Sequence, residues 1–267
     1  MTTTTPVLGQ WPRAPLALVL AQVRFDTFLN LSEVAAVFRE RIAKEFPRVQ
    51  TVQRMTWPIG VAVGAPADPP KDPVGAYVFA NPENTKSVRL ELNVLTYAVT
   101  SYVKYEGHFE AELKELVLAV STSKELFVTR VGLRYVDFIV PMNGASPDDY
   151  VQEPCGRSPT IDSALAHTAF NLFDYKMDQG MMRVQYGRGH GCPTLPPDLQ
   201  SLQLTPVHVM EKDIVGPTAI LDTDRWMEPS VSLPAKKIMV LFSTIHADMS
   251  AAFRRIITKR ALEDWGA

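Results

Sequence analysis

The stretch Phe127-Val-Thr-Arg-Val-Gly-Leu-Arg-Tyr-Val-Asp-Phe-Ile-Val-Pro141 has the strongest β-strand composition in the chain. β-Branched and aromatic residues dominate it, and it alternates over a long run with little helix signal. Residues two apart share a face of a strand. One face should carry Phe127, Val131, Leu133, Tyr135 and Ile139, and the other Arg130, Gly132, Arg134 and Phe138. Because an apolar core does not need two arginines flanking a glycine, we predict a central strand with one polar face.

Part of this stretch resembles a known signature. Gly132-Leu-Arg-Tyr-Val-Asp-Phe-Ile139 is similar to the central motif of a sporadically distributed bacterial family of unknown function, GLRY followed by Ile, Asn, a basic residue and Ile. The chain departs from the motif at Asp137 and Phe138. Other segments that fit are Pro15-Leu16 leading into Ala21-Gln-Val-Arg-Phe25, Leu221-Asp-Thr-Asp224 and the helix expected around residues 241–258. The resemblance implies a bacterial protein and no established activity.

Composition indicates a globular protein with a large core. The 267 residues are 46% hydrophobic and 21% charged. A net charge of −2 argues against a global basic field for DNA, RNA or anionic membranes. Cys155 and Cys192 lack CxxC spacing, which is typical of a reduced cytosolic chain. The N-terminus has no basic region, and the apolar run 16–21 is too short to span a membrane, so we expect a cytoplasmic protein.

The first half, residues 15–141, should read β-α-β-β-β-α-β. Asn30, with Glu33 three residues later, is typical of a helix start, and Pro47 should stop that helix. The strands should cover 16–25, 49–63, 75–79, 88–101 and the central stretch, and the second helix 109–120.

The second half follows a loop over residues 142–166. A hairpin over 168–176 and 181–188, strands over 201–209 and 217–225, and a long helix from Pro234 that bends or restarts at Thr258 should fill residues 167–267. Residues 1–14 read as a loose arm pinned by Trp11. We predict one compact α+β domain: a large twisted antiparallel sheet on which two amphipathic helices from the first half and one long C-terminal helix pack.

Charge gathers on several predicted strand faces. These are Gln22/Arg24/Asp26, Arg89/Glu91/Asn93, Arg130/Arg134 and Asp222/Asp224. Two interpretations stay open: a solvated sheet face with cross-strand ion pairs, or a polar pocket whose arginines bind phosphate or carboxylate. The candidate ligand-binding residues are Arg130, Arg134, Glu91, Asp222 and Asp224. We expect Arg134 to be at least half buried and paired with Glu91 or with the Asp222/Asp224 pair.

Metal and cofactor signals are weak. Asp222 and Asp224 with Glu228 are a conceivable Mg²⁺ set, although pairing with the arginines is the favoured alternative. A closed barrel of arginines and acids would be similar to the triphosphate-tunnel enzymes, but Gln22-Val-Arg-Phe-Asp26 replaces their Glu-x-Glu-x-Lys motif. We predict no metal and no cofactor.

Two histidine regions are read as structural. The segment Gly187-Arg-Gly-His-Gly-Cys-Pro193 reads as a surface turn, since it lacks a phosphate-loop ending, and His190, Cys192 and His208 lack metal-site spacing. His246, one position off an apolar helix stripe, is expected at the edge of the core rather than as a general base.

No nucleophile elbow or dinucleotide fingerprint demands an enzyme. The first hypothesis is a non-enzymatic module that binds a partner protein, in the toxin–antitoxin or defence setting that the sporadic family suggests. The alternative is a phosphate- or nucleotide-binding protein or enzyme that uses the Arg/Asp cluster. Basic residues in the last helical turns leave a contact with an acidic partner or RNA open; they are Arg254, Arg255, Lys259 and Arg260.

Overall fold

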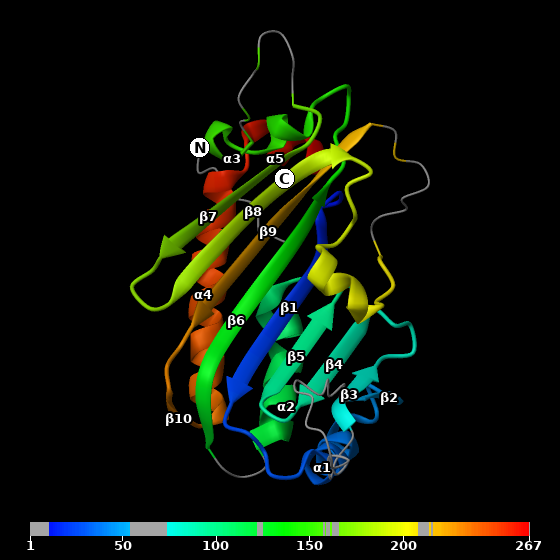
Figure 1. The fold of residues 1–267 in the computed structure, drawn as a ribbon, viewed down its shortest axis with the longest axis vertical. Coiled ribbons are helices and arrows are strands. Elements are labelled where there is room, and N and C mark those ends of the chain that lie inside the picture. The colour runs from blue at the N-terminus through cyan, green and yellow to red at the C-terminus, as the bar shows by residue number, and fades with distance from the viewer. Residues whose placement is uncertain are drawn as a thin grey trace, which may run out of the picture.

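A ten-stranded antiparallel sheet organises the molecule (Figure 1). The computed structural model describes residues 11–53, 74–121, 125–156, 158, 161, 166–207, 214 and 216–266. The strand order is β2-β3-β4-β5-β1-β6-β9-β8-β7, and β10 pairs with β6. The strands are β1 Leu16–Phe25, β2 Arg48–Gln53, β3 Val74–Ala80, β4 Lys86–Glu91, β5 Val94–Val99, β6 Leu126–Ile139, β7 Ala169–Lys176, β8 Met181–His190, β9 Pro217–Met227 and β10 Val231–Leu233.

Three helices cover one face of this sheet, as the α+β prediction required (Figure 1). They are α1 Leu31–Ile42, α2 Glu110–Ser121 and α4 Ala235–Ile256. Shorter elements are η1 Tyr105–Phe109, η2 Pro147–Tyr150, α3 Glu153–Gly156, η3 Pro197–Leu202 and α5 Lys259–Trp265. We call the sheet face opposite α1, α2 and α4 the open face; η3 lies over part of it. In the part of the chain that the structure describes, no helix is long and apolar enough to cross a bilayer.

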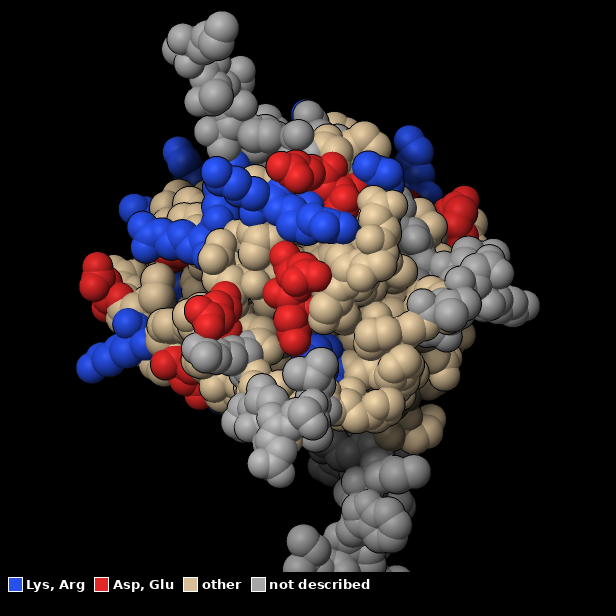
Figure 2. Space-filling model, turned by 90° about the horizontal axis from the view of Figure 1, so that it is seen from above, with Lys and Arg blue, Asp and Glu red and all other residues tan. Residues whose placement is uncertain are grey.

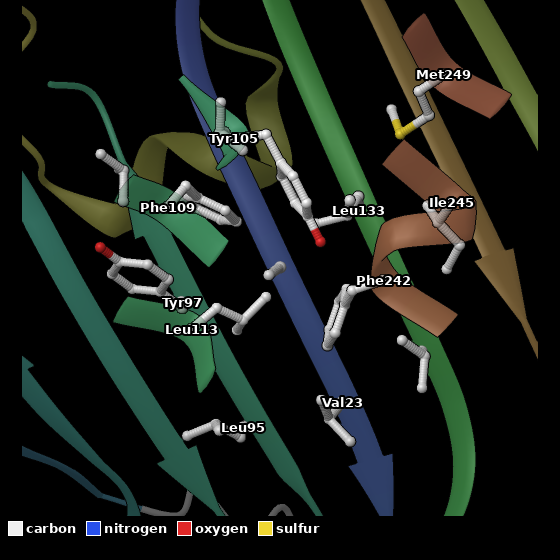
Figure 3. Close-up of a cluster of buried hydrophobic side chains, with 14 of the residues drawn as sticks. Val23, Leu95, Tyr97, Tyr105, Phe109, Leu113, Leu133, Phe242, Ile245 and Met249 are labelled. Atoms are coloured by element: carbon white, nitrogen blue, oxygen red, sulfur yellow. The ribbon is translucent and has the colours of Figure 1, made fainter. Parts of the chain in front are cut away.

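The main core lies between the sheet and the helices (Figure 3). Val23 of β1 and Leu133 of β6 face Leu113 of α2 and Phe242 and Ile245 of α4, and all of these side chains are buried. A smaller apolar cluster lies on the open face, beneath η3. It contains Leu18, Val136, Phe138, Leu199 and Ile220. The rest of the open face is therefore free to carry polar groups.

The central strand β6 departs from simple alternation at one point. Arg24 lies opposite Arg130, but the next residue, Phe25, lies opposite Val128, so Thr129 is an extra residue in the ladder. This β-bulge turns Val128 toward the helices and Phe127 away from them: Val128 is fully buried, whereas Phe127 is 40% exposed. The prediction that Phe127 shares the face of Val131 was therefore wrong.

Two other strand predictions need correction. The run 88–101 is a hairpin of β4 and β5 rather than one strand, because Leu92 and Asn93 form a turn and Leu90 pairs with Leu95. In the run 201–209, the described residues form the end of η3 followed by a non-strand segment. Pro196 and Pro197 start η3, since a proline at the first helical position gives up no needed hydrogen bond.

Three other local signals behave as predicted, whereas the first helix ends at Ile42, before the predicted stop at Pro47. The Asn30 side chain accepts hydrogen bonds from the backbone N–H groups of Ser32 and Glu33 and so caps α1. Thr258 caps α5, which restarts the C-terminal helix. In the β7–β8 hairpin, Gly180 has φ 81°, and a Cβ there would lie 2.0 Å from the carbonyl oxygen of Trp226. Only glycine fits this position without displacing the backbone.

The segment before β1 is anchored to the C-terminal helices. Trp11 is buried and stacks against Phe253 at 6.1 Å and Trp265 at 6.0 Å between ring centroids. The predicted role of Trp11 as a pin agrees with this packing. Residues 1–10 of the predicted arm and 54–63 of the predicted strand 49–63 lie outside the described residues.

Candidate functional site

The predicted Arg/Asp cluster lies on the open face, where β6 and β9 pair. Arg130 and Arg134 project from β6, and Asp222 and Asp224 project from β9. Their strand neighbours of opposite parity, such as Leu133 and Leu221, belong to the main core on the helix side. Strand alternation therefore brings four of the five candidate residues together.

Arg134 is saturated with carboxylate partners. Its Nε and Nη2 donate to Asp222 Oδ1 and Oδ2 at 2.8 and 2.7 Å, and its Nη1 and Nη2 donate to Asp198 at 2.5 and 3.2 Å. Burial by itself would lower the pKa of Arg134, but the hydrogen bonds to both aspartates outweigh burial and raise it. The Arg134 hydrogen bonds also lower the pKa of Asp198. These two bidentate pairs bind the guanidinium as a structural group.

Arg130 is less completely satisfied. Its Nη2 is 3.2 Å from Asp224 Oδ2, and its guanidinium lies 4.7 Å from the ring centroid of Trp226. Its Nε is buried and has no acceptor among the residues that the structure describes. Burial lowers the pKa of Arg130, and Arg24, opposite it on β1, lowers it further against the attraction of Asp224. Gly132 leaves room here, since a Cβ at this position would lie 3.3 Å from the Trp226 Cβ.

Glu91 does not join the cluster. Its strand β4 is separated from β6 by β5 and β1, and Glu91 instead accepts from Arg89 at 2.6 Å. The prediction that Glu91 pairs with Arg134 was wrong, because alternation fixes the face of a strand but not the order of strands in the sheet. Asn93, predicted on the same face as Arg89 and Glu91, lies in the turn after β4.

A Mg²⁺ site at Asp222 and Asp224 is not supported. Both Asp222 oxygens accept from Arg134, and Asp224 accepts from Arg130. No group of three or more metal-ligating side chains occurs in the described part of the chain. Over these same residues the sheet has two open ends, β2 and β7, so it does not form the closed barrel of a tunnel enzyme.

Two ion-pair partners escaped prediction. Asp198 lies in η3, which strand alternation could not predict. The only sequence signal for its position is the pair of prolines at 196–197, which is typical of a helix start. Arg225 lies on the helix side of β9, is 2% exposed, and donates to Asp248 of α4 at 3.1 Å and to the backbone carbonyl of Trp226. Its odd-numbered position directly after Asp224, which places it on the strand face opposite Asp222 and Asp224, was the available signal.

The glycine-rich segment 187–193 is partly a strand. Gly187 and Arg188 belong to β8, as the predicted strand 181–188 required, and β8 continues to His190, so the prediction of a surface turn was wrong for Gly187 to His190. Gly187 accommodates the Phe170 ring of β7, which would lie 3.3 Å from a Cβ there. His190 stacks on His167 at 4.9 Å, and His208 lies outside the described residues.

His246 of α4 takes part in an aromatic cluster on the helix side. Its ring stacks on Tyr105 at 4.0 Å, and its Nδ1 is 2.9 Å from the Tyr135 hydroxyl. Its Nε2 is 3.5 Å from Glu106. Burial lowers the pKa of His246 although Glu106 opposes the shift, so the ring is neutral at neutral pH. This arrangement agrees with the expected position at the edge of the core.

Comparison with known proteins adds no assignment to this geometry. No protein-family model and no curated protein matches the chain.

Charge at the C-terminal end of the molecule is mixed in sign. Arg260 is 2.8 Å from Asp264, and Arg188 is 2.8 Å from Asp148. Viewed from this end, Lys and Arg lie beside Asp and Glu (Figure 2). A contact with RNA or an acidic partner at Arg254, Arg255, Lys259 and Arg260 stays a prediction.

Proposed function

We propose that this chain is a non-enzymatic binding module whose partner is another protein, and that the partner adds an extended segment to the outer edge of β7. The carrying observation is that β7 ends the sheet with exposed apolar side chains on both of its faces. The same proposal places the chain in the sporadic bacterial family with the GLRY motif and in a toxin–antitoxin or defence setting in the cytoplasm. The resemblance of Gly132–Ile139 to the motif supports both parts.

The edge strand β7 is unusually apolar. Among the described residues it pairs only with β8, so its outer backbone groups are not used by the sheet. On the open face Phe170 is 64% and Leu172 46% exposed. On the helix side Tyr175 is 49% exposed. Natural sheets usually cover such edges or fill them with charges, so an apolar edge is typical of a strand that pairs with another chain.

A groove on the helix side makes room for the partner's side chains. It has a volume of about 360 Å³ and lies between β7, β8 and α4, with Tyr175, Met177, Met182 and Val184 in its wall. Side chains of an added strand would alternate between the two faces of the extended sheet. One set would cover Phe170 and Leu172, and the other would enter this groove. An extended segment with apolar residues fits both surfaces.

The saturated arginine supports a binding role over catalysis. The Arg134 guanidinium donates hydrogen bonds to Asp222 and Asp198 through all three of its nitrogens. It therefore has no pair of N–H groups free to bind a substrate. A second ligand at this place would first have to break two charge-assisted pairs.

The proposal predicts a complex that depends on β7. Products of neighbouring genes should be co-expressed with this chain, and the affinity of any complex measured with purified components. Phe170→Lys and Leu172→Lys place a charge against the docked segment and should each weaken binding on the order of 10- to 100-fold. Val37→Lys, at a 44% exposed apolar position on α1, is the matched control and should bind as the wild type does.

Two results would contradict the proposal. One is that no neighbouring product forms a complex with the wild-type chain. The other is a complex that β7 variants and the α1 control weaken equally.

A second candidate function is phosphate or nucleotide binding, which Arg24 and Arg130 favour. The two arginines lie opposite each other on β1 and β6. Arg24 Nε donates to the Gln22 amide oxygen at 2.9 Å, and among the described residues Asp224 is the only carboxylate that pairs with Arg130. A phosphate oxygen would relieve the repulsion between these two cations.

Thermal unfolding with nucleotides, with and without Mg²⁺, tests the second candidate. A ligand at 100 times its Kd should raise the free energy of unfolding by about 2.7 kcal/mol, and Arg130→Met should abolish the shift. Arg183→Met, which breaks the exposed pair with Asp174, is the control. If no nucleotide moves the unfolding temperature, or if Arg130→Met responds as the wild type does, phosphate binding at this place is wrong.

A further inference from the structure

A small pocket opens on the helix side of the sheet, on the face opposite the Arg/Asp cluster. It lies between the start of β1, the end of β6 and the second half of α4, and its volume is about 60 Å³. This is room for about four water-sized groups. Its walls include four aromatic side chains, from Trp11, Tyr102, Tyr135 and Phe253. The pocket is distinct from β7 and from the groove beside β7.

One wall of this pocket carries a carboxyl group that lacks a partner. Asp137 of β6 is 3% exposed, and it forms no hydrogen bond or ion pair with any residue in the described ranges. Its strand neighbours are Leu16 on β1 and Leu221 on β9, which offer only apolar side chains. Burial, and secondarily the negative charge of Asp222 on the other sheet face, raise the pKa of Asp137 to about 8. A buried, unpaired carboxyl is costly unless it serves a ligand.

The other polar groups around the pocket do not satisfy Asp137. His246 is engaged with Tyr135 through Nδ1 and faces Glu106 through Nε2. Ser250 Oγ, one turn further along α4, is 3.5 Å from that same Nε2. Since His246 is uncharged at neutral pH, no described side chain lining the pocket supplies a positive charge.

We propose that this pocket binds a small organic cation, an alkylammonium, with the ammonium group on the Asp137 carboxylate and its carbon chain against the aromatic walls. Aromatic faces attract cations, and a carboxylate provides the counter-charge. A metal ion fits less well, because Asp137 and His246 supply the only carboxylate and imidazole groups among the described residues of the wall. The volume limits the ligand to a short chain, such as propylammonium.

The binding step exchanges one cation for another. In the empty pocket at neutral pH Asp137 holds a proton, so RNH₃⁺ + Asp137–COOH gives Asp137–COO⁻·RNH₃⁺ + H⁺. Raising the pH by one unit should therefore increase the affinity about tenfold as long as the pH is below 8. Above pH 8 the affinity should become constant, while the amine itself stays charged. Several other titratable groups lie around Asp137 and the pocket. They are Asp222 from β9, Tyr135 from β6, Tyr102 from the segment after β5, and His246 from α4 with its partner Glu106 from η1.

Calorimetric titration with propylammonium chloride tests this assignment. At pH 8.5 binding should be saturable, and at pH 6.5 it should be more than tenfold weaker. Titrations in buffers of different ionisation enthalpy at pH 6.5 should show the release of about one proton. The neutral analogue 1-propanol should not bind at the same concentrations.

Three variants separate the carboxylate from the aromatic wall. Asp137→Asn keeps the shape and should abolish both the binding and the proton release. Tyr102→Leu should weaken binding roughly 3- to 30-fold, whereas Tyr102→Phe, which keeps the ring, should bind as the wild type does. Unfolding curves of each variant show whether the fold is retained.

A second ligand distinguishes the source of the ammonium group. Nα-acetyl-lysine amide presents the same group as a side chain of a protein, and tighter binding of propylammonium assigns the pocket to a free amine. Tighter binding of the lysine derivative would overturn that assignment. The proposal as a whole fails if neither ligand binds at pH 8.5, or if Asp137→Asn binds as the wild type does. Neither failure affects docking at β7, which is measured with other variants.

Discussion

Replacing Arg134 by alanine is expected to lower the free energy of unfolding by roughly 3–5 kcal/mol. Arg134 is only 15% exposed in its side chain, and it covers Asp222, which is 2% exposed. Its removal leaves the Asp222 carboxylate buried without its counter-charge. Urea unfolding of wild type and variant, followed by fluorescence of the tryptophans, gives the difference directly.

Two further variants show whether the lost stability comes from the buried charge. The double variant Arg134→Met with Asp222→Leu removes both charges and should recover most of the loss, because well-packed apolar pairs can replace buried ion pairs. Arg183→Ala, which breaks the exposed pair with Asp174, should leave the unfolding midpoint unchanged. If Arg134→Ala also leaves the midpoint unchanged but abolishes binding of a ligand, Arg134 serves that ligand. An unchanged midpoint with unchanged binding would contradict both interpretations.

Replacing Asp137 by asparagine is expected to stabilise the protein, and increasingly so as the pH rises. The folded carboxyl has a pKa of about 8, whereas an unfolded aspartate titrates near pH 3.9. Between these values the folded wild type holds a proton that the unfolded chain has lost, so its stability falls with rising pH and becomes constant above pH 8. From pH 4 to pH 7 this amounts to roughly 3–4 kcal/mol, which Asp137→Asn should not lose.

Unfolding free energies measured at intervals from pH 4 to pH 9 test this slope. Asp198→Asn is the control of opposite sign. The hydrogen bonds from Arg134 lower the pKa of Asp198, so removing that carboxylate should destabilise the protein at neutral pH. Parallel pH profiles for the wild type and Asp137→Asn would show that Asp137 is not the group responsible.

Much of the fold was predictable because its signals are local. The alternation of β6, the cap at Asn30, the turn ending at Gly180 and the restart at Thr258 each depend on residues a few positions apart. The errors have local causes too. The bulge at Thr129 reversed the face of Phe127, and the Leu92 turn divided one predicted strand into β4 and β5.

The candidate site was predictable only in part. Alternation identified Arg130 and Arg134 as residues of a polar strand face, and Asp222 and Asp224 as residues of another. The pairing of β6 with β9 brings these two faces together. Alternation could not decide which acid meets Arg134, because that depends on the order of the strands. Glu91 satisfies the same pattern as Asp222, yet two strands separate it from β6.

The sequence by itself determined that the chain forms an α+β fold with a large antiparallel sheet, a polar face on its central strand and a long C-terminal helix. These follow from periodicity, caps and turns, which act over a few residues. Only the tertiary structure decided the partners of Arg134, the apolar outer edge of β7 and the unpaired carboxyl of Asp137 in its aromatic pocket. Each of these depends on which segments, distant in sequence, lie side by side, and that placement results from packing of the whole sheet against its helices.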